Sequence, residues 1–131
     1  MKAVQTSGRR KTAVARATLI AGNGVIRVNS QLLNNMSSEL YRMRMQEPLI
    51  IAGDIVKTVN INILVQGGGV ASQADATRLA IARALSIVDK NLQKEFLNYD
   101  RTLLVADVRS KETHKPNCHG KARAKRQKSY R

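Results

Sequence analysis

The sequence lacks the features that would place the protein in an oxidising compartment or in a membrane. Cys118 is the only cysteine in 131 residues, so no intrachain disulfide can form and a reducing compartment is expected. No run approaches the roughly 18 apolar residues that span a bilayer. Residues 1–10 contain no apolar core of signal-peptide length. We therefore expect a cytoplasmic protein.

Aromatic and acidic residues are also scarce. The chain has three Tyr, one Phe and no Trp, which argues against a stacking platform for single-stranded nucleic acid. Only nine Asp and Glu oppose 23 Lys and Arg, and this net charge of +14 indicates a polyanionic partner. After Arg109 there is no Leu, Ile, Val, Phe or Trp, so a membrane-binding amphipathic helix is not expected there. Nucleic acid is the favoured partner.

The positive charge is concentrated at the end of the chain. Residues 1–108 carry 14 basic and 8 acidic side chains, whereas residues 109–131 carry 9 and 1. The first segment is long enough to bury most of its apolar surface. The second cannot repay its ordering entropy by burial. We therefore predict a globular domain over residues 1–108 and an extended basic C-terminal arm over residues 109–131.

The first 28 residues predict three strands. Residues 2–5 fit a short edge strand, and the basic segment 7–11 fits a loop. Apolar and polar side chains alternate over residues 12–21, which is the period of a half-buried strand. Gly22-Asn23-Gly24 tolerates positive φ, and an apolar run follows at residues 25–28. We therefore predict that residues 12–21 and 25–28 form a β-hairpin.

The middle of the chain predicts short helices followed by a strand. Residues 31–53 have an irregular helical pattern, and Pro48 interrupts it, so we expect two short helices there. Residues 56–65 alternate again, with Val59 and Ile61 on one face, and predict a strand.

Two helices are expected after that strand. The first runs from about Ser72 to Val88, with Ser72 and Asp75 forming a capping box. The second covers residues 92–98. This order of elements indicates a two-layer α/β (α+β) domain.

The glycine turn Gly67-Gly68-Gly69 has three possible roles. Its backbone N–H groups and the following helix dipole could bind a nucleotide phosphate. However, no Lys-Ser/Thr follows at P-loop spacing, and the Gly-x-Gly-x-x-Gly pattern is absent. The turn could instead contact an RNA backbone, or the glycines could allow a tight turn and close packing of the helix on the sheet.

The sequence predicts no metal site and no catalytic set. His114, Cys118 and His119 supply three candidate ligands, whereas a structural zinc site needs four. Exposed polar loop residues are the alternative interpretation. The carboxylates of the domain are scattered and mostly flank helices, where they fit dipole or capping roles. We expect no enzyme activity, no cofactor and no small-molecule substrate.

Two clusters of basic residues carry the functional prediction. The first comprises Arg9, Arg10 and Lys11, with Arg16 on the adjoining strand. The second lies in the arm and comprises Lys121, Arg123, Lys125, Arg126, Lys128 and Arg131. Five phosphate contacts from the arm would give a log–log salt slope of about −3.5 to −4.5. We predict that both clusters bind nucleic acid, mainly through phosphates.

Three blocks of the sequence together carry a family resemblance. The first block is Gly8-Arg9-Arg10-Lys11-Thr12-Ala13-Val14-Ala15-Arg16. The second comprises Gly67-Gly68-Gly69, Ser72-Gln73, Ala76, Ala80 and Ala82-Arg83-Ala84-Leu85. The third comprises Leu103-Leu104, Asp107, Arg109, Glu112, Gly120-Lys121-Ala122-Arg123, Gln127, Ser129 and Arg131. These blocks resemble the family of the universal ninth protein of the small ribosomal subunit, and they cover nearly the whole chain in the family's order.

The resemblance implies a structural constituent of the small ribosomal subunit, located in its head beside neighbouring head proteins. It implies a two-layer domain with a left-handed βαβ crossover. Ribosomal RNA would be bound by Arg9, Arg10, Lys11, Arg16, Gly67, Gly68, Arg109, Lys115, Lys121, Arg123, Lys125 and Arg126. The arm, which could span about 70 Å, would thread through this RNA. Its last residues, Lys128, Ser129, Tyr130 and Arg131, would contact the peptidyl-site tRNA during translation.

Tyr130 departs from the bacterial pattern of the family, which has Lys at the penultimate position. The point charge is lost there, and Tyr130 could stack or donate a hydrogen bond from its hydroxyl group instead. Together with residues 113–119, this indicates the archaeal or eukaryotic branch. Two other functions are compatible with the basic arm or the glycine turn, namely a general nucleic-acid architectural protein and an enzyme that binds phosphate at the turn.

Overall fold

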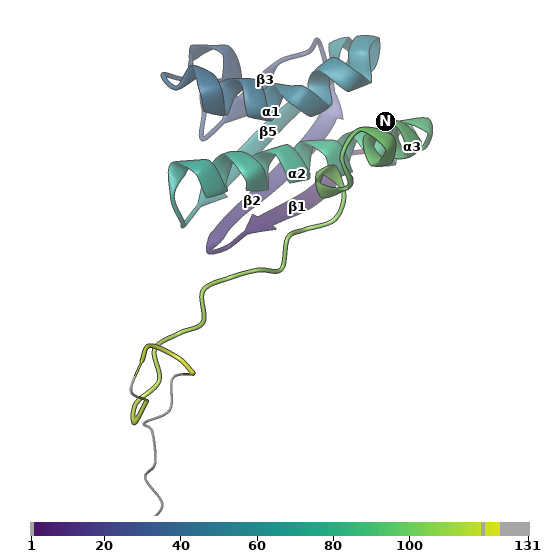
Figure 1. Cartoon of the computed structure of the whole chain (residues 1–131). Coiled ribbons are helices and arrows are strands. Elements are labelled where there is room, and N and C mark those ends of the chain that lie inside the picture. Colours follow the sequence, from purple (N-terminus) through teal and green to yellow (C-terminus); the bar gives the residue numbers. More distant parts are fainter. Residues whose placement is uncertain (1, 119, 124–131) are drawn as a thin grey trace, which may run out of the picture.

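A five-stranded sheet and three α-helices form the domain in the computed structural model, which describes residues 2–118 and 120–123 (Figure 1). The strands are β1 (Val4–Arg10), β2 (Ala13–Ala21), β3 (Ile26–Val28), β4 (Gln31–Leu32) and β5 (Val59–Gln66). The helices are α1 (Glu39–Ala52), α2 (Val70–Val88) and α3 (Asn91–Tyr99). Short 3₁₀ turns occur at Leu33–Asn35, Gly53–Thr58 and Arg101–Leu103.

The helices lie together on one face of the sheet, which leaves the other face open (Figure 1). The strand order is β1-β2-β5-β3-β4. Only β3 and β5 are parallel, and α1 lies in the connection between them, whereas the other neighbours are antiparallel. The predicted two-layer α+β domain and its βαβ unit are therefore confirmed. The left hand of the crossover stays a prediction from the family resemblance.

The predicted hairpin between residues 12–21 and 25–28 is wrong. Strand β5 lies between β2 and β3, so those two strands are not neighbours. The hairpin is formed by β1 and β2, which pair from Val4–Leu19 to Arg10–Ala13 around a turn in which Lys11 has a φ of 53°. Residues 7–10 consequently belong to a strand and not to a basic loop.

The segment between β2 and β3 crosses the end of β5. Gly22 and Gly24 donate backbone hydrogen bonds to Thr58 and Val59, at 2.9 and 3.0 Å. The side-chain oxygen of Asn60 accepts from the backbone N–H groups of Asn23 and Val25, both at 2.9 Å. These long-range bonds give the glycine-containing segment a partner other than its sequence neighbours, which is why a local turn signal predicted the wrong pairing.

Alternation along the strands builds the core as predicted. In β2 and β5 every second side chain is buried, at Ala13, Ala15, Ala17, Leu19, Val59, Ile61, Ile63 and Val65. The opposing side of α2 buries Ala76, Ala80 and Ala84. Small side chains on both surfaces let the helix approach the sheet closely, and Phe96 of α3 and Leu103 close the end of this core.

Two helix predictions need correction. Residues 39–52 form one helix, α1, and Pro48 lies inside it, almost fully buried. Tertiary packing of this face offsets the missing hydrogen bond that usually ends a helix at proline. Helix α2 begins at Val70, and its N-cap is Gly69 without a side-chain cap, so Ser72 and Asp75 form no capping box.

After the 3₁₀ turn at Arg101–Leu103, the described residues contain no further helix or strand (Figure 1). Residues 112–118 and 120–123 then turn back on themselves. The backbone N–H of Lys115 donates to the carbonyl oxygen of Lys121 at 3.0 Å. Within the described residues, no helix combines the length and apolarity needed to span a bilayer.

Candidate nucleic-acid interface

The face of the sheet that the helices leave uncovered carries three exposed arginines, Arg9 of β1, Arg16 of β2 and Arg27 of β3. We call this surface the open face. Strand register places Ser7 opposite Arg16 and Arg27 opposite Asn62, so polar side chains surround the arginines. A hollow of about 780 Å³ crosses it and is lined by residues that include Gln5, Arg16, Thr18, Arg27, Asn62 and Leu64.

No carboxylate balances these arginines within the sheet. The five strands contain Arg9, Arg10, Arg16 and Arg27 but not one Asp or Glu. In the part of the chain that the structure describes, Arg9, Arg16 and Arg27 form no ion pair. Arg9 only donates a hydrogen bond to the carbonyl oxygen of Lys11, at 3.3 Å. The open face therefore presents unneutralised positive charge on a hollowed surface that mixes polar and apolar side chains. Such charge suits a polyanion.

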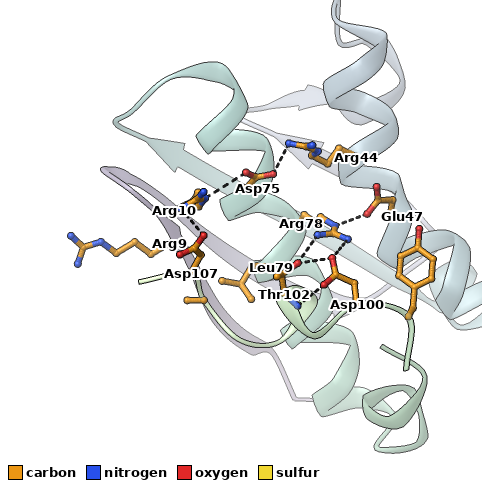
Figure 2. Close-up of a pocket in the computed structure, with 12 residues that line it drawn as sticks. Arg9, Arg10, Arg44, Glu47, Asp75, Arg78, Leu79, Asp100, Thr102 and Asp107 are labelled. Carbon is orange, nitrogen blue, oxygen red and sulfur yellow. Dashed lines mark hydrogen bonds and ion pairs between the residues drawn. The ribbon is translucent and has the colours of Figure 1, made fainter. Parts of the chain in front are cut away.

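Arg10 points to the helix side of β1 and is engaged within the protein (Figure 2). Its guanidinium lies 2.9 Å from the carboxylate of Asp107 and 3.7 Å from that of Asp75. It also donates to the backbone carbonyl of Arg109 at 3.3 Å. Asp75 is shared with Arg44 of α1, at 3.0 Å. Arg10 thus ties β1 to α2 and to the root of the arm, whereas Arg9 extends away from these carboxylates (Figure 2).

This ion-pair cluster continues along α2. Arg78 pairs with Glu47 of α1 and, at 2.9 Å, with Asp100. Burial raises the pKa of Asp100, but hydrogen bonds from Thr102 and Arg78 outweigh it and lower the pKa. Each carboxylate in the cluster already has a basic or hydroxyl partner, so the hollow of about 560 Å³ that it lines is charge-balanced. We therefore interpret it as a structural junction between elements.

Asp107 anchors the start of the arm. Side-chain and backbone hydrogen bonds from Arg109 lower the pKa of Asp107 below its usual range, and the charge of Arg10 adds to this effect. The same contacts raise the pKa of Arg109, whose side chain is otherwise exposed. A phosphate that binds Arg109 would therefore either share its guanidinium with Asp107 or displace the carboxylate of Asp107 from it.

Gly67 and Gly68 lie where the turn after β5 packs on the β1–β2 hairpin. Both have positive φ, of 76° and 67°. A Cβ on Gly67 would lie 2.6 Å from the carbonyl oxygen of Thr12, and one on Gly68 would lie 2.9 Å from the nitrogen of Ala13. The glycines are therefore needed for close packing. Gly67 also lines a hollow of about 380 Å³ with Arg16, so the turn borders the open face.

Of the predicted arm residues, Lys115 and Arg123 are held by one carboxylate. Each lies 2.6 Å from Glu112, and their hydrogen bonds, Lys115 first, lower the pKa of Glu112. Lys121 is exposed nearby, and Lys11 is exposed at the β1–β2 turn. The remaining predicted residues, Lys125, Arg126, Lys128, Ser129, Tyr130 and Arg131, lie outside the described residues.

Two of the three candidate metal ligands, His114 and Cys118, belong to the described residues. His119 lies outside the described residues. His114 is exposed, and the thiol of Cys118 donates to the carbonyl oxygen of Ala122 at 3.6 Å. Among residues 2–118 and 120–123, no three His, Cys, Asp or Glu side chains are grouped to hold a metal ion.

Sequence reasoning missed Arg27. The strand that carries it was expected to pair with β2 in a hairpin, where Arg27 had no basic neighbour to mark it. In the structure β3 pairs with β5, and Arg27 faces the same hollow as Arg16. Alternation along residues 25–28 was the available signal, because it places Arg27 on the polar side of its strand.

Comparisons with known proteins give a consistent result. A family model described as ribosomal protein S9/S16 matches residues 8–131. Small ribosomal subunit protein uS9 of Methanococcus maripaludis strain S2 is 48% identical over 134 residues, which covers the whole of both chains. The uS9 proteins of M. maripaludis strain C7 and of M. vannielii are 48% and 47% identical over the same length.

Proposed function

The chain belongs to the S9/S16 family of ribosomal proteins, and we propose that it binds small-subunit ribosomal RNA through the open face of its sheet. It is a structural protein of the small ribosomal subunit and not an enzyme, as its relatives are named. The family resemblance is thereby confirmed over nearly the whole chain. The finer proposal concerns which surfaces meet which RNA.

One observation carries the proposal for the open face, namely that it holds three arginines without an ion-pair partner among the described residues, and that the strands contain no carboxylate. A dense array of phosphates is the natural counterpart of such a surface. The strands also lack aromatic residues, since Tyr41, Phe96 and Tyr99 all belong to helices. Base stacking therefore has no platform on the sheet, and contacts to phosphate and sugar are expected to dominate.

The arm supplies the second proposed contact. Arg109, Lys115, Lys121 and Arg123 would follow ribosomal RNA away from the domain, with Lys125 and Arg126 continuing the path. Residues 109–131 carry nine basic side chains and one acidic one, which favours such a path. By family resemblance, Lys128 to Arg131 would contact the peptidyl-site tRNA.

Charge-removing variants test the open face. Arg16→Gln combined with Arg27→Gln removes two charges from it, whereas Arg101→Gln combined with Lys94→Gln removes two exposed charges from the helix layer. We expect the first variant to make the negative log–log salt slope for binding small-subunit RNA shallower by about 1.4–1.8. The second variant should change this slope little. Equal losses from both variants would contradict a site on the open face.

A shortened arm tests the tRNA contact. Small subunits reconstituted with the full chain or with a chain lacking Lys128 to Arg131 would be compared by chemical protection. We expect unchanged protection of ribosomal RNA and weaker binding of tRNA at the peptidyl site. Unchanged tRNA binding would remove the tRNA contact from the proposal and leave the arm as an assembly element.

A further inference from the structure

Helix α1 exposes three large apolar side chains on its outer surface. Leu40 is 69% exposed, Met43 54% and Ile50 76%. Their spacing of three and seven residues places them on one side of the helix. We call this set the outer stripe of α1.

The opposite side of α1 is already used for packing. Met45, Pro48 and Ala52 are buried there, where α1 lies beside α2 over the sheet (Figure 1). A helix that is apolar on two sides is typical of one covered on both sides. Scattered exposed apolar residues are normal on a protein surface, but three aligned on one helix form a patch that indicates an interaction site.

The charges around the outer stripe argue against RNA as its partner. Arg42 pairs with Glu39 at 3.9 Å, and Arg44 pairs with Asp75 at 3.0 Å. Glu47, the remaining residue in the line of the stripe, pairs with Arg78. The two arginines of α1 therefore already have carboxylate partners, whereas the arginines of the open face have none among the described residues.

The distribution of charge along the whole chain supports this distinction. Residues 1–32 carry six basic and no acidic side chains, residues 33–108 carry eight of each, and residues 109–131 carry nine and one. The segment that contains α1 thus contributes nothing to the net charge of +14. A second copy of the chain is also a poor partner, because two molecules of this charge repel each other.

We infer that the outer stripe of α1 is a docking surface for an apolar patch on another protein of the small ribosomal subunit. The flexible side chain of Met43 can adapt to an irregular partner surface. The inference uses the membership of the chain in the subunit and does not depend on RNA binding by the open face.

Photocrosslinking from the stripe tests the inference. Ile50→Cys would be made in a Cys118→Ser background, labelled with a benzophenone maleimide, and assembled with small-subunit RNA alone or with RNA and the other small-subunit proteins. We expect a crosslink to a protein in the complete assembly and none to RNA in either assembly. A crosslink to RNA, a crosslink to a second copy of the chain, or no crosslink in the complete subunit would overturn the inference.

A competition experiment provides an independent readout. Leu40→Ser combined with Ile50→Ser should fold normally, because both side chains are exposed, and should bind small-subunit RNA as tightly as the parent. We expect it to lose several-fold in competition with the parent for incorporation into subunits. Ile87→Ser with Leu97→Ser, which changes two exposed apolar residues on α2 and α3, serves as the matched control. Equal incorporation of both variants, or weaker binding of the stripe variant to RNA alone, would contradict the docking surface.

Discussion

At the scale of single residues, Gly8 lies where β1 meets the backbone of α2. A Cβ on Gly8 would overlap the carbonyl oxygen of Ala76 and would lie 2.8 Å from the nitrogen of Ala80. Both atoms belong to a helix backbone that cannot move aside alone. Gly8 is therefore required by packing, although it lies in the block of basic residues through which the family resemblance is recognised.

Gly8→Ala should separate β1 from α2 and destabilise the fold. We expect the free energy of unfolding to fall by about 1–3 kcal/mol, measured by urea denaturation. Gly69→Ser is the control, because a Cβ at Gly69 meets nothing within 4 Å, its φ of −97° suits any residue, and serine differs little from glycine at a helix N-cap. That variant should change stability by less than about 0.5 kcal/mol. Equal effects of the two substitutions would show that the contact with α2 does not limit residue size at Gly8.

Asp107 should make the free energy of unfolding depend on pH in the acid range. Its pKa is lower in the fold than in the unfolded chain, where it is about 3.9, because Arg109 and Arg10 stabilise the carboxylate. The resulting stability is present above the unfolded pKa and is lost as the pH falls through and below it. Asp107→Asn should therefore be less stable at pH 6 and should lose less stability than the parent between pH 6 and pH 3.

Denaturation midpoints measured across that range check the prediction. Asp54→Asn removes a carboxylate whose side chain is 92% exposed and serves as the control. It should follow the pH dependence of the parent. If Asp107→Asn did the same, the contacts of Asp107 with Arg109 and Arg10 would not stabilise the fold.

At the scale of elements, the faces of the strands could be predicted but not their neighbours. Alternation correctly placed Ala13 and Ile61 in the core, because it depends only on the period of the strand. The order β1-β2-β5-β3-β4 depends on pairing between distant segments, and the Gly22-Asn23-Gly24 signal fits either a tight hairpin or a crossing. Asn60, 35 positions beyond Val25, decides between them by accepting hydrogen bonds from that segment.

Asn60→Ala should weaken the crossing from β2 to β3. It removes the acceptor of two backbone N–H groups, at Asn23 and Val25. We expect a loss of about 1–2 kcal/mol in the free energy of unfolding. Asn62→Ala is the matched control, two positions along the same strand, and should leave stability nearly unchanged because Asn62 is exposed on the open face. A larger loss from Asn62→Ala would show that Asn60 does not hold the crossing.

Local helix signals failed at Pro48 and Ser72 for a related reason. Proline is unfavourable within a helix, yet burial of Pro48 against the core keeps α1 continuous. Ser72 with Asp75 fits a capping box, yet Asp75 bonds Arg10 and Arg44 and the helix begins earlier. In both cases contacts from remote segments outweigh a preference that the local sequence expresses.

At the scale of the whole molecule, charge separates into two basic regions and one balanced region. All nine carboxylates lie outside the strands, in the helices, the segments that flank them and the arm. Composition alone predicted a basic surface and a basic arm. It could not show which arginines have partners, because Arg10 and Arg9 are adjacent in sequence but only Arg10 reaches the carboxylates of Asp75 and Asp107. Their different roles follow from the position of Asp107, far along the chain.

The loop at residues 112–123 changes the reach of the arm. Fully extended, the residues after Arg109 could span about 70 Å. The backbone hydrogen bond between Lys115 and Lys121 brings together two positions that are six residues apart. While the loop persists, it therefore shortens that span by about 20 Å. Lys115 and Arg123 share the single carboxylate of Glu112 in the loop. Opening the loop would therefore both lengthen the arm and release these two cations from their shared partner.

The most direct test of the account is to locate ribosomal RNA relative to the two faces of the sheet. An iron chelate that generates hydroxyl radicals would be attached at Asn62→Cys on the open face or at Glu95→Cys on α3, both in a Cys118→Ser background. Each protein would then be assembled into small subunits. We predict strong cleavage of ribosomal RNA from position 62 and weak cleavage from position 95. Stronger cleavage from position 95 would place the RNA on the helix layer and contradict binding by the open face.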